Sequence, residues 1–112
     1  MSFDEGLAER IREIFQMDRS VSEKKMFGGL AFITRGYMFV GILGDNLMAR
    51  VGPENYEQAL SRFHVRKMDF TGKPMKGYVF VAPPGFEKDS DLYQWVNQCL
   101  IFVKSLPPKK PK

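Results

Sequence analysis

The sequence predicts an α+β domain with two layers, in which helices pack against one face of an antiparallel sheet. Two patterns carry this prediction. Amphipathic segments with helical periodicity occur near the start, in the middle and at the end of the chain, and short apolar runs separated by glycine-containing turns lie between them. The early strands follow one another without intervening helices, which indicates a hairpin meander rather than the βαβ units of a parallel sheet.

The first helix is predicted from Asp4 to Met17, because apolar residues recur there at helical spacing with charged residues on the opposite face. Asp4 and Glu5 lie in its first turn, where carboxylates complement the positive end of the helix dipole. Gly6 costs the helix about 1 kcal/mol relative to alanine, and the amphipathic pattern outweighs this cost.

A short strand is predicted next, followed by a bend or bulge at Gly28-Gly29 and a three-stranded antiparallel meander. The turns of the meander are Arg35-Gly36 and Gly44-Asp45-Asn46, where glycine supplies the positive φ that tight turns require. The four strands are expected over residues 22–26, 30–34, 37–43 and 47–51.

Gly52-Pro53 ends the meander and begins a second helix, predicted from Glu54 to Arg62, because proline is favoured at the first helical position. The segment from His64 to Lys76 is rich in Gly, Pro and Lys and is predicted to be irregular. It leads to a further strand over residues 77–82, whose β-branched and aromatic residues favour extended structure.

The last helix is predicted to end near Ser105, with Asp89, Ser90 and Asp91 as candidate caps at its start. Cys99 falls on its apolar stripe and is expected to be a small core residue, with a reactive thiol as the alternative. As the single cysteine, it allows neither an internal disulfide nor a cysteine-based zinc site of the usual kind.

The composition is that of one soluble globular domain. Of the 112 residues, 44% are hydrophobic and 27% are charged, unlike disordered chains. No apolar run approaches the roughly 18 residues of a membrane span, and the first residues are acidic where a secretory signal is basic. We therefore expect a cytoplasmic protein with one domain over residues 1–106 and a flexible basic Pro/Lys-rich tail over residues 107–112.

No catalytic constellation is recognisable. His64 is the only histidine and has no nucleophile-base pair beside it, and the glycines match no nucleotide-binding motif. We therefore expect a protein that is not an enzyme and that holds no cofactor or metal. The alternative, a small enzyme, would require a pocket that holds His64, Arg50 or Asp69 close together.

The charge argues only weakly for a nucleic-acid partner. Removing the three tail lysines from the net charge of +4 leaves +1 for the rest of the chain, whereas nucleic-acid readers usually carry a basic face on the domain itself. Strand aromatics beside basic residues are also the usual ingredients of a single-strand stacking platform, although packing in the core explains such rings equally. The aromatics are Phe27, Phe32, Tyr37, Phe39, Tyr78 and Phe80, and the basic residues are Lys25, Arg35, Lys67 and Lys76.

Arg50 is unusual because it lies within an apolar strand. If it is covered, it needs a carboxylate or a backbone partner, and it would then stabilise the fold or take part in binding.

A resemblance to a known family rests on four separated segments, which are residues 25–32 (KMFGGLAF), 47–53 (LMARVGP), 68–78 (MDFTGKPMKGY) and 105–109 (SLPPK). These segments resemble the N-terminal domain family of the competence regulator TfoX, in its single-domain form. The resemblance spans nearly the whole chain and implies a two-layer α+β fold similar to the secretion-chaperone-like group. It also implies a link to the regulation of DNA uptake, contacts with other proteins including a possible homodimer, and no catalytic residues.

Together these patterns predict a non-enzymatic regulatory or adaptor domain that contacts an unknown protein partner. The alternative is a nucleic-acid-binding accessory protein that uses the basic tail and a surface of Lys, Arg and aromatic residues. The binding surface is expected at residues 25–29 and in the loop of residues 69–76, because long irregular loops in compact domains often carry function. The structural alternatives are a glycine bend for the first segment and a surface crossover for the second. The expected binding residues are Lys25, Phe27, Gly28, Gly29, Arg50, Asp69, Lys73 and Lys76.

Overall fold

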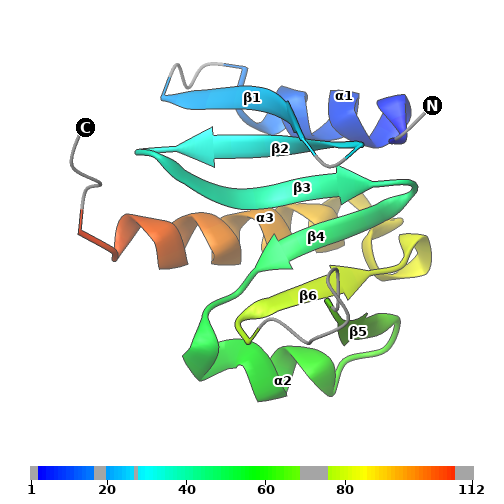
Figure 1. The fold of residues 1–112 in the computed structure, drawn as a ribbon. Coiled ribbons are helices and arrows are strands. Elements are labelled where there is room, and N and C mark those ends of the chain that lie inside the picture. Colours follow the sequence, from blue (N-terminus) through cyan, green and yellow to red (C-terminus); the bar gives the residue numbers. More distant parts are fainter. Residues whose placement is uncertain (1–2, 17–19, 27, 69–75, 108–112) are drawn as a thin grey trace.

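The computed structural model describes residues 3–16, 20–26, 28–68 and 76–107, which form an α+β fold with three α-helices and a six-stranded sheet (Figure 1). This confirms the predicted fold class. In chain order the elements are α1 (Glu5–Ile14), β1 (Val21–Met26), β2 (Gly29–Thr34), β3 (Tyr37–Leu43), β4 (Asn46–Arg50), the 3-10 helix η1 (Pro53–Asn55), α2 (Tyr56–Leu60), β5 (Val65–Lys67), β6 (Tyr78–Val81), the 3-10 helix η2 (Pro83–Phe86) and α3 (Asp89–Lys104).

The sheet is antiparallel throughout, with the strand order β1-β2-β3-β4-β6-β5. The predicted meander is β2-β3-β4, and the other strands extend it on both sides. Arg35 and Gly36 join β2 to β3 with φ angles of 54° and 85°. Both are positive, as the tightest hairpin turns require.

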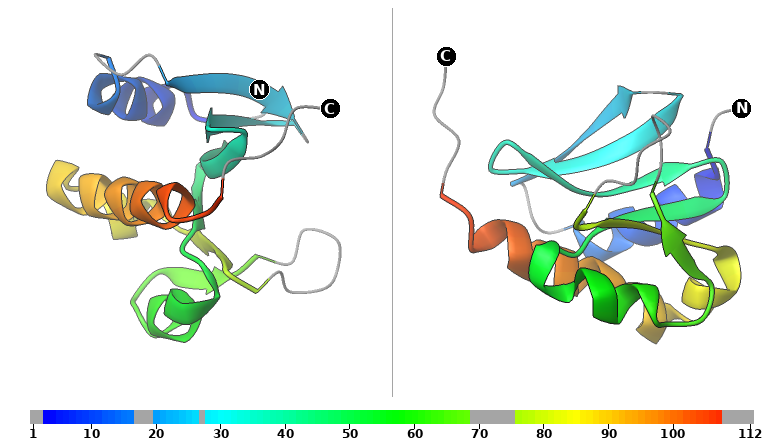
Figure 2. Two further views of the ribbon diagram at one scale, coloured as in Figure 1. Left: turned by 90° about the vertical axis from the view of Figure 1, so that its left-hand side faces the viewer. Right: turned by 60° about the horizontal axis from the view of Figure 1, so that its bottom comes forward.

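The helices lie on one side of the sheet, so the molecule has two layers (Figure 2, left). Alternation along the strands turns one face of the sheet toward them. In register across four strands, Phe32, Val40, Ala49 and Val79 are all buried in the core that the two layers enclose. From the helical layer, α3 contributes Trp95 and the other buried residues of its inner face.

Three predicted segments differ from the structure. The first helix ends at Ile14 instead of Met17, and residues 15 and 16 form a turn. The stretch from His64 to Lys76 was expected to be irregular, but it contains β5, which pairs with β6. Residues 66 and 67 are both exposed and show no alternation, so pairing with β6, rather than local preference, makes this strand. The second helix is also shorter than predicted, because the chain makes a 3-10 turn from Pro53 before α2 begins and α2 ends at Leu60.

The helix starts are only partly as predicted. Asp4 caps α1, and its Oδ1 accepts a hydrogen bond from the Gly6 amide at 2.9 Å. The prediction that Asp89, Ser90 or Asp91 caps α3 is wrong, because the N-cap is Lys88, which has extended backbone angles and makes no side-chain cap bond. Asp89 is already inside the helix and accepts a hydrogen bond from Arg10 Nη2 instead, at 3.2 Å.

Candidate functional site

The outward face of α3 is a part of the surface that packing within the domain does not explain. From Leu92 to Val103 the helix carries no charged residue. A helix on the surface of a soluble protein normally presents charged and polar residues to solvent, whereas a helix without charges is normally covered on all sides. Here only the inner face is covered by the sheet.

Two large apolar side chains stand out on this face. Tyr93 is 53% exposed and Ile101 is 62% exposed. Asn97 lies midway between them, and because residues four positions apart share a helix face, the three form one line along α3. We call Tyr93, Asn97 and Ile101 the α3 ridge.

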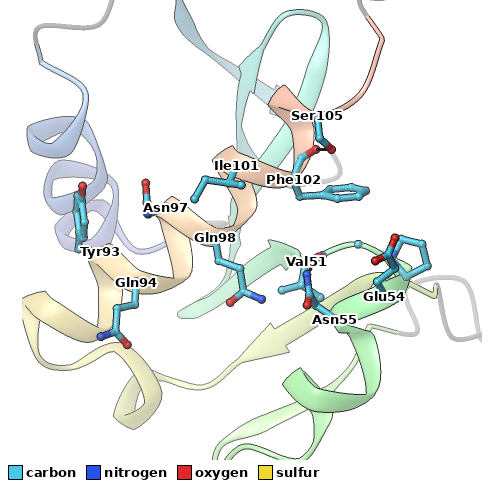
Figure 3. Close-up of a pocket in the computed structure, with 12 residues that line it drawn as sticks. Val51, Glu54, Asn55, Tyr93, Gln94, Asn97, Gln98, Ile101, Phe102 and Ser105 are labelled. Atoms are coloured by element: carbon cyan, nitrogen blue, oxygen red, sulfur yellow. Dashed lines mark hydrogen bonds between the residues drawn. The ribbon is translucent and has the colours of Figure 1, made fainter.

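A groove of about 500 Å³ runs along one side of the α3 ridge (Figure 3). Its opposite wall is the stretch from Val51 to Asn55, which leaves β4 and enters η1. Three amide side chains from α3, those of Gln94, Asn97 and Gln98, line the groove together with the apolar Ile101 and Phe102. Amides both donate and accept hydrogen bonds, so the groove can pair with polar groups of a partner while Tyr93 and Ile101 supply apolar contact.

A smaller hollow of about 210 Å³ lies on the other side of the α3 ridge. Its apolar lining comes from Ile14 and Phe15, next to the end of α1, and from Val96 and Leu100 of α3. The α3 ridge therefore stands between two hollows, which is the shape that one packing helix presents to another.

The groove wall is held in place by a close contact between Gly52 and Phe102. Gly52 has a φ of 89°, and a Cβ atom there would lie 2.5 Å from Cε1 of Phe102. Only glycine has both the backbone freedom and the small size that this position needs. The contact fixes how closely the Val51–Asn55 stretch approaches α3.

Arg50 also packs on Phe102. Its guanidinium carbon lies 5.4 Å, 5.3 Å and 5.5 Å from the ring centres of Tyr37, Tyr78 and Phe102. The sequence led us to expect a carboxylate or backbone partner for Arg50. Within the described part of the chain, its half-buried side chain instead makes cation-π contacts with these three rings. Among the described residues that were predicted for binding, Arg50 packs on Phe102, which lines the groove.

The other predicted binding residues are spread over the molecule. Lys25 is exposed on the edge strand β1, Gly28 is exposed in the turn after it, and Gly29 is buried against the backbone of Ile42. These residues lie at the end of the sheet near the β3–β4 turn, whereas Arg50 and the exposed Lys76 lie toward the opposite end (Figure 1). Phe27, Asp69 and Lys73 fall outside the described residues.

Of the three candidate residues for an enzyme, the structure describes His64 and Arg50. His64 lines a separate hollow of about 450 Å³ with Arg62, Trp95 and other residues, but not with Arg50. Asp69 is not among the described residues. In the described ranges, no group of three or more His, Cys, Asp or Glu side chains is arranged to hold a metal ion.

Cys99 lies on the inner face of α3 and is fully buried. Burial raises the pKa of its thiol well above the ordinary value, because the thiolate would lose its solvation. The thiol is therefore neutral and shielded, as expected for a core residue rather than a nucleophile.

The predicted stacking platform is largely part of the core. Phe32, Phe39 and Phe80 are buried, and Tyr37 and Tyr78 are half-buried beside Arg50. Sequence reasoning missed the α3 ridge, although the uncharged run from Leu92 to Val103 was a usable signal for it.

The model of the TfoX N-terminal domain family matches residues 13–103 of the 112. No curated protein and no solved structure matches the chain significantly. In the part of the chain that the structure describes, no helix is both long enough and apolar enough to span a membrane.

Proposed function

The chain belongs to the TfoX N-terminal domain family, and we propose that it is a non-enzymatic regulatory or adaptor domain that acts through protein contacts at the α3 ridge and its groove. The observation that carries this proposal is the exposure of Tyr93 and Ile101 in line on the uncharged stretch of α3 from Leu92 to Val103.

The chemistry of this face is that of a protein interface. Interface centres are depleted in charge and enriched in aromatic residues, and Tyr93 and the uncharged stretch around it have both properties. Burying the exposed parts of Tyr93 and Ile101 would contribute on the order of 1–2 kcal/mol each. The amides of Gln94, Asn97 and Gln98 would remain satisfied by pairing with polar groups of the partner.

The proposal is tested by placing a photoreactive benzophenone amino acid at position 101 of the intact protein in cells. The matched control carries the same group at Gln58, which is exposed on α2 and does not line the groove. We expect discrete cross-linked protein products from position 101 and none from position 58. An equal yield at the two positions, or no product at either, would overturn the proposal.

A second candidate function, nucleic-acid binding, is favoured by a cluster of basic and aromatic groups beyond the end of the groove. Arg35 donates a hydrogen bond from Nη1 to the carbonyl of Lys104 at 2.7 Å, and Arg50 packs on Phe102, two residues earlier in α3. The half-buried Tyr37 and Tyr78 lie beside Arg50. Cations next to partly exposed rings suit a single-stranded backbone and its bases.

A further inference from the structure

We infer that the occupant of the α3 ridge is the α3 ridge of a second copy of this chain, with the two helices antiparallel and Asn97 on the two-fold axis. This inference rests on the proposed function, because it names the protein that the surface binds.

The spacing of the ridge is self-complementary. Tyr93 and Ile101 lie four residues before and after Asn97. A two-fold axis through Asn97 therefore places each Tyr93 against Ile101 of the second copy, and each Asn97 amide against its own equivalent. Closed dimers use one patch twice in this manner, and a polar residue at the centre of a helix pair fixes its register and orientation.

The charges at the two ends of α3 favour an antiparallel orientation of the two helices. The start of the helix is acidic, with Asp91 in its first turn next to Asp89, whose carboxylate also accepts a hydrogen bond from Arg10. Its last turn carries Lys104, and Arg35 binds the carbonyl of that residue. An antiparallel pair brings each acidic end to a basic end, whereas a parallel pair would place like charges together. A complementary partner needs an uncharged centre with a basic end opposite the acidic end of α3 and an acidic end opposite the basic one. A second α3 in antiparallel orientation has all three features.

The shape of the surface also suits a second α3. The larger hollow beside the ridge, about 500 Å³, takes an inserted row of side chains, as in packing of helix ridges into grooves. The 16 residues of α3 extend about 24 Å, which is close to the shortest dimension of the molecule, 26 Å. A contact along the whole helix is therefore long relative to the size of each copy.

Engineered cysteines test the register. A disulfide needs Cα atoms within about 7 Å, so oxidation should link Asn97→Cys to itself, while Tyr93→Cys alone should stay unlinked. A mixture of Tyr93→Cys and Ile101→Cys should link across the two variants. The wild type, whose Cys99 is buried, and Gln58→Cys are the controls. Self-linking of Tyr93→Cys in preference to Asn97→Cys would overturn the antiparallel pairing.

A charge exchange provides a second test that does not depend on cysteine chemistry. Ser90 and Lys104 are both exposed and lie seven residues on either side of Asn97, so they meet across the antiparallel pair. Ser90→Lys places two lysines together, and Lys104→Glu places a glutamate beside Asp89 and Asp91. We expect each variant alone to dimerise at least tenfold more weakly than the wild type. Their mixture should recover dimers, because each new lysine then faces a new glutamate.

Sedimentation equilibrium of the intact chain reads out both the dimer and its loss. A monomeric wild type, or a dimer that neither charge variant weakens, would overturn this inference. The proposed function is tested separately from the dimer. If position 101 cross-links in cells to a different protein while the purified chain is monomeric, the proposed function is supported and the inference of a second copy is wrong. If position 101 yields no product, both fail.

Discussion

Replacing Gly52 with alanine should destabilise the domain more than the same change at a turn glycine whose added Cβ would meet no other atom. Gly52 has φ 89° and ψ 157°, a region that only glycine adopts readily and that costs other residues about 1–3 kcal/mol. The new Cβ would also lie 2.5 Å from Cε1 of Phe102, and relieving such overpacking costs about 1–3 kcal/mol more. We therefore expect Gly52→Ala to lower the free energy of unfolding by about 2–6 kcal/mol in total.

Gly44→Ala is the matched control for this change. Gly44 also has a positive φ, 63°, but a Cβ atom there meets nothing within 4 Å. The control therefore carries a backbone cost of about 1–2 kcal/mol without a steric cost. Both variants reduce the entropy of the unfolded chain equally, so this effect cancels in the comparison.

Urea unfolding followed by the fluorescence of Trp95 measures the difference. Trp95 is the only tryptophan and is 1% exposed, so its emission reports the loss of the core. With a denaturant dependence of about 2 kcal/mol per molar, Gly52→Ala should move the midpoint down by about 1–3 M. If Gly52→Ala is no less stable than Gly44→Ala, the contact with Phe102 does not hold the groove wall.

Three further predictions concern single groups. Arg12 donates to Glu23 at 2.7 Å and lowers the pKa of that carboxyl, so the pair stabilises the fold above the usual glutamate pKa, and the stability is lost as the pH falls through the lowered value. Urea unfolding should give Glu23→Gln a free energy of unfolding lower than that of the wild type by less than about 1 kcal/mol at neutral pH, and the two should be equally stable in strong acid. The same loss of stability at both pH values would contradict the pairing. Cys99 should react with a thiol reagent only after unfolding, because burial raises the pKa of its thiol, and rapid labelling of the folded protein would contradict this. If the nucleic-acid alternative is correct, Arg50→Met and removal of residues 109–112 should each weaken binding of a single-stranded oligonucleotide, and the truncation should flatten its salt dependence. No binding by the intact chain at low salt would exclude that alternative.

Local patterns in the sequence determined much of the sheet. The bounds of β3 from Tyr37 to Leu43 follow from two glycine-containing turns, because a positive φ is a property of the turn residues themselves. The amphipathic pattern of the first helix and the apolar stripe of the last one likewise depend on spacing along the chain. The family resemblance was also present in the sequence, and the match over residues 13–103 confirms it.

Contacts between distant segments could not be predicted in this way. β5 exists because β6 pairs with it, and Arg50 is held by rings from β3, β6 and α3 that lie far from it along the chain. The groove likewise arises where α3 meets the stretch after β4. The sequence by itself determined most of the other elements and the uncharged stretch of α3, because both depend on residues that are near one another along the chain. Only the tertiary structure decided which face of α3 is left uncovered, because that depends on where the sheet and the other helices pack.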